Sequence, residues 1–157
     1  MIIIFMKKCR FFMFLILCFI IGCSKNQTSI YSFQDNYWNI SDSVDLFFNI
    51  ADTSKTYDIS FFFRNTLEYP YRNLHLLTNI NYLDSLIRKD TVQYAITDKY
   101  GRWLGKGLGS TRDNYFIFKE NKKFYKTGEY KITLIHGMRK KQLVGCNKIG
   151  FKIKKHE

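Results

Sequence analysis

The stretch TYDISFFFR, residues 56–64, decides the fold class because its side chains alternate before they become wholly aromatic. Tyr57, Ile59 and Phe61 stand at every second position, which is the period of a strand with one buried face. Aromatic and β-branched residues are also the types that fit a pleated, half-buried surface. The stretch therefore predicts a β-strand that contributes one face to a hydrophobic core.

The same period of two recurs in the segments that follow. These segments are 74–80, 92–96, 115–118, 128–135 and 149–153, and turn signals at 98–101 and 126–128 separate some of them. The one helix candidate is a short segment from Tyr82 to Arg88. About seven or eight strands without strand–helix–strand alternation predict an all-β fold, a single antiparallel β-sandwich of immunoglobulin-like or jelly-roll-like form.

The first 22 residues differ from the rest of the chain. Lys7, Lys8 and Arg10 precede an apolar run from Phe11 to Ile21. A basic cluster, a short apolar core and a small residue before the cut form a secretory signal. The apolar run is too short for a permanent transmembrane helix, which needs about 20 apolar residues. Residues 1–22 therefore predict a signal peptide.

Gly22-Cys23 resembles the lipobox of bacterial lipoproteins, in which a small residue precedes an invariant cysteine. The resemblance implies cleavage before Cys23, a diacylglycerol on its sulfur and an N-acyl lipid on the new amino terminus. An ordinary cleaved signal or an uncleaved anchor is the alternative. We expect an acylated Cys23 with a flexible tether over residues 23–30 and the β-sandwich over 31–157. No acidic cluster of the surface-export kind follows Cys23, which favours a periplasm-facing protein on the inner or outer membrane.

The formal net charge is +12, and removal of the three basic leader residues lowers it to +9. A basic chain raises the question of nucleic acid as a partner. An envelope location argues against it, and the basic residues are mostly scattered lysines rather than arginines, which read phosphates and bases with two hydrogen bonds. The charge therefore indicates a solvated basic surface beside anionic lipid.

The cysteines and histidines predict neither a disulfide nor a metal site. Cys9 and Cys18 belong to the leader and Cys23 is the lipid site, so Cys146 remains alone and is expected to be a small buried residue. The three histidines are far apart in the sequence and lack zinc-ligand spacing. The acidic residues are spread singly, and no nucleophile motif occurs, so no catalytic residue and no enzyme is predicted.

The glycine-rich segment GRWLGKGLGS, residues 101–110, invites comparison with a phosphate-binding loop. Such a loop has four residues between its first glycine and the Gly-Lys pair, whereas three separate Gly101 from Gly105. No helix pattern follows that would direct a helix N-terminus at a phosphate. We therefore expect these glycines to provide positive φ angles and close backbone approach, while Trp103 packs.

The segment RNTLEYPYRNL, residues 64–74, contains Pro70, the single proline of the chain. Proline keeps a chain extended at the end of a connection, and Asn65 is a residue type that closes turns. The arginines and Glu68 of this segment are able to pair with each other or to form a ligand surface. A structural turn and a binding surface both stay open here.

Taken in order, these motifs resemble the GldH gliding-motility lipoprotein family of the Bacteroidetes. The resemblance rests on Arg64-Asn65, 68–74, Asp90-Thr91 with Tyr94, Asp98, 101–110, 128–130, 136–139 and Gly145. The sequence departs from the expected pattern at Cys146-Asn147, in one loop. The resemblance implies an acylated, non-enzymatic envelope protein associated with gliding and with the type IX secretion apparatus, without catalytic residues or small-molecule substrate.

Two functional hypotheses follow. In the first, the lipid bilayer holds acylated Cys23, and other envelope proteins bind a contact patch of aromatic and basic residues, the types that dominate interfaces. The expected patch is Arg64, Tyr69, Tyr71, Arg72, Trp103 and Lys106. In the second, a carbohydrate- or peptidoglycan-binding sandwich holds glycan on exposed Trp38, Trp103 and tyrosines.

Overall fold

The computed structural model describes residues 26–157, so the predicted signal peptide and Cys23 lie outside the described part. Its elements are β1 (Gln27–Ser32), η1 (Gln34–Asn36), β2 (Tyr37–Asn39), β3 (Val44–Ile50), β4 (Thr56–Thr66), β5 (Asn73–Tyr82), β6 (Ser85–Ala95), β7 (Thr111–Lys123), β8 (Gly128–His136), β9 (Gln142–Val144) and β10 (Cys146–Lys155). Within this range no helix has the length and apolar character needed to cross a membrane.

β4 confirms the prediction from residues 56–64. It lies between β10 and β7 in its sheet and is antiparallel to both. Ile59, Phe61 and Phe63 are buried in the core, as the period of two requires. Phe62 points to the opposite face, where the ring of Tyr115 on β7 covers it at 5.2 Å between centroids. The aromatic run therefore packs on both faces of the strand.

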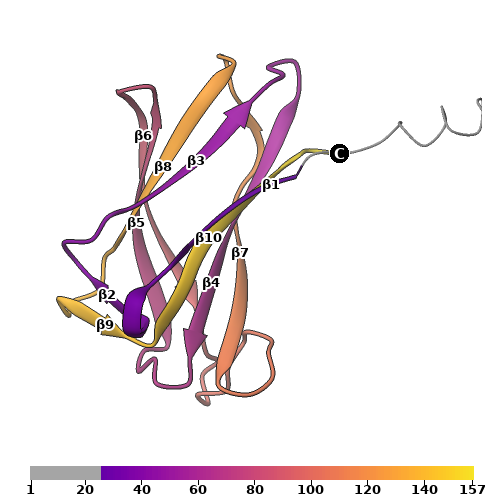
Figure 1. The fold of residues 1–157 in the computed structure, drawn as a ribbon. Coiled ribbons are helices and arrows are strands. Elements are labelled where there is room, and N and C mark those ends of the chain that lie inside the picture. The colour runs from indigo at the N-terminus through magenta and orange to yellow at the C-terminus, as the bar shows by residue number, and fades with distance from the viewer. Residues whose placement is uncertain (1–25) are drawn as a thin grey trace, which may run out of the picture.

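Two four-stranded sheets form the sandwich. One has the order β1-β10-β4-β7 and the other β3-β8-β5-β6, while β2 and β9 make a separate two-stranded pair. Every pairing among the described strands is antiparallel. Figure 1 shows the two sheets facing each other, with β5, β6 and β8 on one side and β4, β7 and β10 on the other. The prediction of an antiparallel β-sandwich is confirmed.

The predicted helix at 82–88 is wrong. Tyr82 and Ser85 pair across a two-residue turn, and β6 continues from Ser85 along β5. A helix here would leave the backbone groups at this end of β5 without the ladder hydrogen bonds that β6 supplies. The sandwich also begins before residue 31, because β1 pairs with β10 from Gln27↔Ile153 onward. The polar composition of β1, as in many edge strands, concealed it.

The strand register defines two opposite ends of the sandwich. The tether end comprises Gln27 and the connections 51–55, 83–84 and 124–127, since Ile50 lies opposite Gly128 and Thr56 opposite Lys123. The motif end comprises the connections 67–72 and 96–110, beyond Thr66 and Thr111. β4 has 11 residues, so about 35 Å separate the two ends at 3.3 Å per residue.

The core explains the environment of the remaining thiol. Cys146 is a free, fully buried cysteine, and burial raises the pKa of its thiol to about 12. A thiol with such a pKa stays protonated at neutral pH, which confirms its prediction as a small buried residue. Between residues 26 and 157 no group of three or more His, Cys, Asp or Glu is placed to hold a metal ion.

Candidate functional site

A buried pair of asparagines organises the motif end. Asn114 on β7 donates through Nδ2 to Asn65 Oδ1 at 2.9 Å and to the Phe63 carbonyl at 3.0 Å. Asn65 Nδ2 donates to the Thr66 carbonyl at 2.8 Å. Gly105 covers this pair so closely that a Cβ there would lie 2.6 Å from Asn114 Oδ1. The glycine-rich segment thus has the structural role expected from its sequence, because its backbone packs on a polar core.

Arg64 and Lys106 both contact Asp113, Arg64 through the carboxylate and Lys106 through the backbone. Arg64 donates to Asp113 with both Nε, at 2.5 Å, and Nη2, at 2.7 Å. Lys106 and Asp113 exchange two backbone hydrogen bonds, at 2.9 and 2.7 Å, which hold the 96–110 connection against β7. The hydrogen bond from Arg64, more than any other cause, lowers the pKa of Asp113, although burial opposes it. The two hydrogen bonds from Arg64 therefore keep the carboxylate ionised, and the backbone pair with Lys106 holds the connection in place.

Arg64→Met is expected to lower the free energy of unfolding by about 1 kcal/mol at neutral pH, because the pair is only partly buried. The pKa of Asp113 is depressed in the folded protein, so the pair stabilises above the unfolded pKa of about 4 and loses this effect as pH falls through the folded pKa. The difference between wild type and variant should therefore shrink in acid. Urea unfolding at neutral and acidic pH measures it; a difference independent of pH would contradict the assignment. Arg139→Met, at an exposed arginine, is the control and should change stability by less than about 0.5 kcal/mol.

A second cluster surrounds Asp98. Its Oδ1 accepts hydrogen bonds from the backbone N–H groups of Tyr100, at 2.8 Å, and Arg102, at 2.9 Å. These bonds, with that of Arg102 foremost, lower the pKa of Asp98. Arg72 Nη2 donates to the Asp98 carbonyl at 3.1 Å, and the partly buried Trp103 packs against the core beside this turn. Arg72 and Trp103 therefore both lie beside the turn formed by Asp98.

Tyr69 does not belong to the surface. The expected patch includes it, but the Tyr69 ring is buried, packs edge-to-face on Phe63 at 5.5 Å and donates its hydroxyl to the Asn73 carbonyl at 2.9 Å. Gly145 allows this position, since a Cβ at residue 145 would meet the Tyr69 backbone nitrogen at 2.5 Å. The other five residues lie at or near the surface of the motif end, with Arg72 and Lys106 exposed and Arg64, Tyr71 and Trp103 partly buried.

Exposed apolar side chains complete the surface of the motif end, and residue-type reasoning missed them. Leu108 is 97% exposed, and Leu67, Tyr100 and Leu104 are exposed as well. A leucine between two glycines in a connection, as in Gly107-Leu108-Gly109, was the signal available in the sequence. Apolar side chains beside unburied cations form the usual composition of a protein contact surface.

The glycan hypothesis expects an exposed Trp38, and this expectation is wrong. Its side chain is 0% exposed and lies in the core, between Phe33 at 4.9 Å and His136 at 5.4 Å from its ring centroid. A ring without an accessible face is unable to stack on a sugar. Trp103 is only partly exposed and packs against the core.

The chain matches known proteins over most of its length. The family model described as GldH lipoprotein matches residues 25–153. A gliding motility lipoprotein GldH homolog from Christiangramia forsetii is 33% identical over 127 residues, which cover 76% of this chain and 78% of the relative. The gliding motility lipoprotein GldH of Flavobacterium johnsoniae is 24% identical over 144 residues, covering 87% of this chain and 89% of the relative.

Similarity to solved structures is weaker. A family 35 carbohydrate binding module from Clostridium thermocellum aligns with a TM-score of 0.37 and 12% identity, covering 82% of this chain and 90% of that structure. At this TM-score the likeness carries no argument about function.

Proposed function

The chain belongs to the GldH lipoprotein family, and from this membership we propose that it is a non-enzymatic accessory of the gliding and type IX secretion machinery. A lipoprotein of this family is anchored to a membrane of the cell envelope. Cys23 carries the diacylglycerol and the N-acyl lipid, and the β-sandwich faces the periplasm. The motif end binds other envelope proteins of the machinery.

One observation carries the contact role. Most of the residues that resemble the family motifs, namely 64–74, Asp98, 101–110, 136–139 and Gly145, lie at or near the motif end, although they come from segments far apart in the sequence, whereas 128–130 lie at the tether end. β1 begins at the opposite end, so an anchor at Cys23 leaves the motif end directed away from the bilayer. Asp98 and Asp113 are both hydrogen-bonded to arginine side chains, which favours recognition over acid–base chemistry at this end.

Photocrosslinking in intact cells tests this role. A photoreactive amino acid at Leu108 should yield a protein adduct that mass spectrometry identifies as a component of the gliding or secretion machinery. Leu108 is almost fully exposed, so the substitution should leave folding unchanged. The same probe at Ile117, an exposed residue on the side of β7, is the control and should not give that adduct. Adducts of equal yield at both positions, or none to such a component at Leu108, would contradict the proposal.

A further inference from the structure

The tether end is geometrically bound to stay near the bilayer. Four residues lead from Cys23 to Gln27, and an extended chain spans at most about 3.6 Å per residue, so Gln27 lies within about 14 Å of Cys23. Gln27 is itself fixed to β3, because its Nε2 donates to the Asn49 carbonyl at 2.6 Å and its Oε1 accepts from the Asn49 N–H at 2.8 Å. With a lipid anchor at Cys23, the connections around Gln27 would therefore be the part of the sandwich closest to the headgroups.

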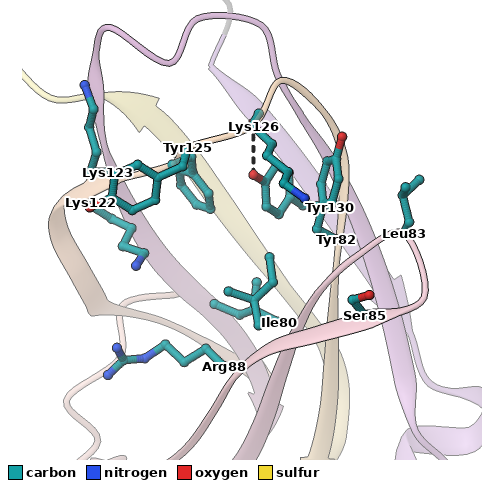
Figure 2. Close-up of a pocket in the computed structure, with 12 residues that line it drawn as sticks. Ile80, Tyr82, Leu83, Ser85, Arg88, Lys122, Lys123, Tyr125, Lys126 and Tyr130 are labelled. Atoms are coloured by element: carbon teal, nitrogen blue, oxygen red, sulfur yellow. Dashed lines mark hydrogen bonds between the residues drawn. The ribbon is translucent and has the colours of Figure 1, made fainter.

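A hollow of about 360 Å³ opens at this end, between the β5–β6 hairpin and the β7–β8 connection (Figure 2). Seven of its twelve lining residues are apolar or aromatic, four are cations, and none is a carboxylate. The cations are Arg88, Lys122, Lys123 and Lys126. Arg88 is paired with Asp90 at 2.5 Å, which leaves the three lysines as the charges available to an anion.

Two of these lysines lie over aromatic rings. The Lys126 ammonium is 5.1 Å from the centroid of the Tyr82 ring, and that of Lys122 is 5.9 Å from the centroid of Phe124. Tyr130 donates its hydroxyl to the Lys126 carbonyl at 2.9 Å, drawn as a dashed line in Figure 2. Neither lysine forms an ion pair with any carboxylate of residues 26–157. These two cations thus lie over aromatic rings without a direct ion pair to a carboxylate of the described residues.

The rim of the hollow exposes large apolar side chains where polar ones are usual. Tyr125 is 83% exposed, and Leu83 is 71% exposed at the tip of the β5–β6 turn. Leu83 has φ +51°, in the left-handed region that glycine and asparagine adopt at lower cost. A leucine that is both strained and exposed is suited to contact with an apolar medium, which would cover its side chain. Asp84, the next residue, is exposed and does not line the hollow.

Resting on the proposed acylation of Cys23, we propose that the tether end is a docking surface for an anionic phospholipid bilayer. Lys122 and Lys126 bind lipid phosphates, while Leu83 and Tyr125 enter the interface between headgroups and acyl chains. Lysine ammonium groups are attracted to an anionic membrane surface, and tyrosine rings prefer the interfacial layer because one end is apolar and the other polar. The sandwich then has a fixed orientation on the membrane, with the motif end pointing away from the bilayer, and does not reorient freely on its tether.

Depth-dependent fluorescence quenching tests the docking surface with the mature lipoprotein in vesicles. The indole introduced by Tyr125→Trp should be quenched by lipids brominated near the headgroup in vesicles that contain phosphatidylglycerol. Quenching should be weaker in vesicles made of phosphatidylcholine alone. Lys122→Gln and Lys126→Gln should each lower the ratio of docked to undocked protein about fivefold, which corresponds to about 1 kcal/mol per lysine. Leu108→Trp places the indole at the motif end, is the matched control and should stay unquenched. The wild-type protein measures the fluorescence of Trp38 and Trp103, which is subtracted from the signal of each variant.

Several results would overturn the docking surface. The first is equal quenching of the Tyr125→Trp and Leu108→Trp indoles. The second is quenching that stays the same in both lysine variants. The third is loss of quenching on addition of inorganic phosphate, which would identify free phosphate as the ligand. Mass spectrometry of the purified protein reports acylation of Cys23 separately. A missing lipid contradicts the proposed function, whereas an acylated protein with an unquenched Tyr125→Trp indole contradicts the docking surface alone.

Discussion

Trp38→Ala is expected to lower the free energy of unfolding by about 3–5 kcal/mol, the cost of truncating a large buried aromatic side chain. Trp38 fills the space between Phe33 and His136, and its Nε1 donates to the Asp42 carbonyl at 2.8 Å. The substitution removes the packing contacts and leaves that carbonyl without this donor. A loss of this size is a large share of the 5–15 kcal/mol typical of a domain.

Urea unfolding followed by circular dichroism measures the loss. Tyr37→Ala is the matched control, because Tyr37 is the neighbouring residue on β2 and is exposed. It should change the free energy of unfolding by less than about 0.5 kcal/mol. If Trp38→Ala were as stable as Tyr37→Ala, the side chain of Trp38 would have to lie at the surface, and the glycan platform would regain its main residue.

Cys23→Ala is expected to abolish labelling with palmitate and to move the protein from the membrane to the soluble fraction. The variant is placed behind a secretory leader whose cleavage does not depend on lipid, so that an uncleaved leader does not act as an anchor. Each buried methylene of an acyl chain contributes about 0.8 kcal/mol, so the loss of the acyl chains removes most of the binding to the bilayer. A wash at high salt removes protein that is held by lysines alone.

Cys146→Ala is the control for cysteine chemistry. Cys146 is buried in the core, so its replacement should leave both the palmitate label and the membrane fraction unchanged. Membrane retention of Cys23→Ala after the salt wash, with no label, would contradict the anchor. If the palmitate label were lost in Cys146→Ala instead, Cys146 and not Cys23 would be the residue that carries the lipid.

Local pattern was enough for most of the strands and for much of the motif end. The alternation in 56–64 and 128–135 predicts β4 and β8, because one buried face demands a period of two. Residues 82–88 resemble a helix because their apolar side chains recur four residues apart, and only pairing with β5 makes them part of a hairpin. Five of the six residues of the expected patch lie at or near the surface of the motif end, because they stand at the end of β4 or in the connections beside it.

The sequence did not predict where individual side chains lie in the fold. Tyr69 is buried because Gly145 lets its backbone approach closely, and the two residues come from connections far apart along the chain. The hollow likewise depends on Leu83 in the β5–β6 hairpin and Tyr125 in the β7–β8 connection lining the same space. The sequence around Tyr69, Leu83 or Tyr125 does not show which distant residues each of them lies beside in the fold.

The sequence by itself determined the sandwich class, the family resemblance and the prediction of lipid at Cys23, because each depends on side-chain period or on adjacent residues. Only the tertiary structure decided that Trp38 is a core residue, that most of the family motifs share one end, and that lysines without an ion pair surround an apolar hollow at the other. The physical reason is that burial and charge pairing are properties of strand order and register. Both arise from contacts between residues that are remote in the chain.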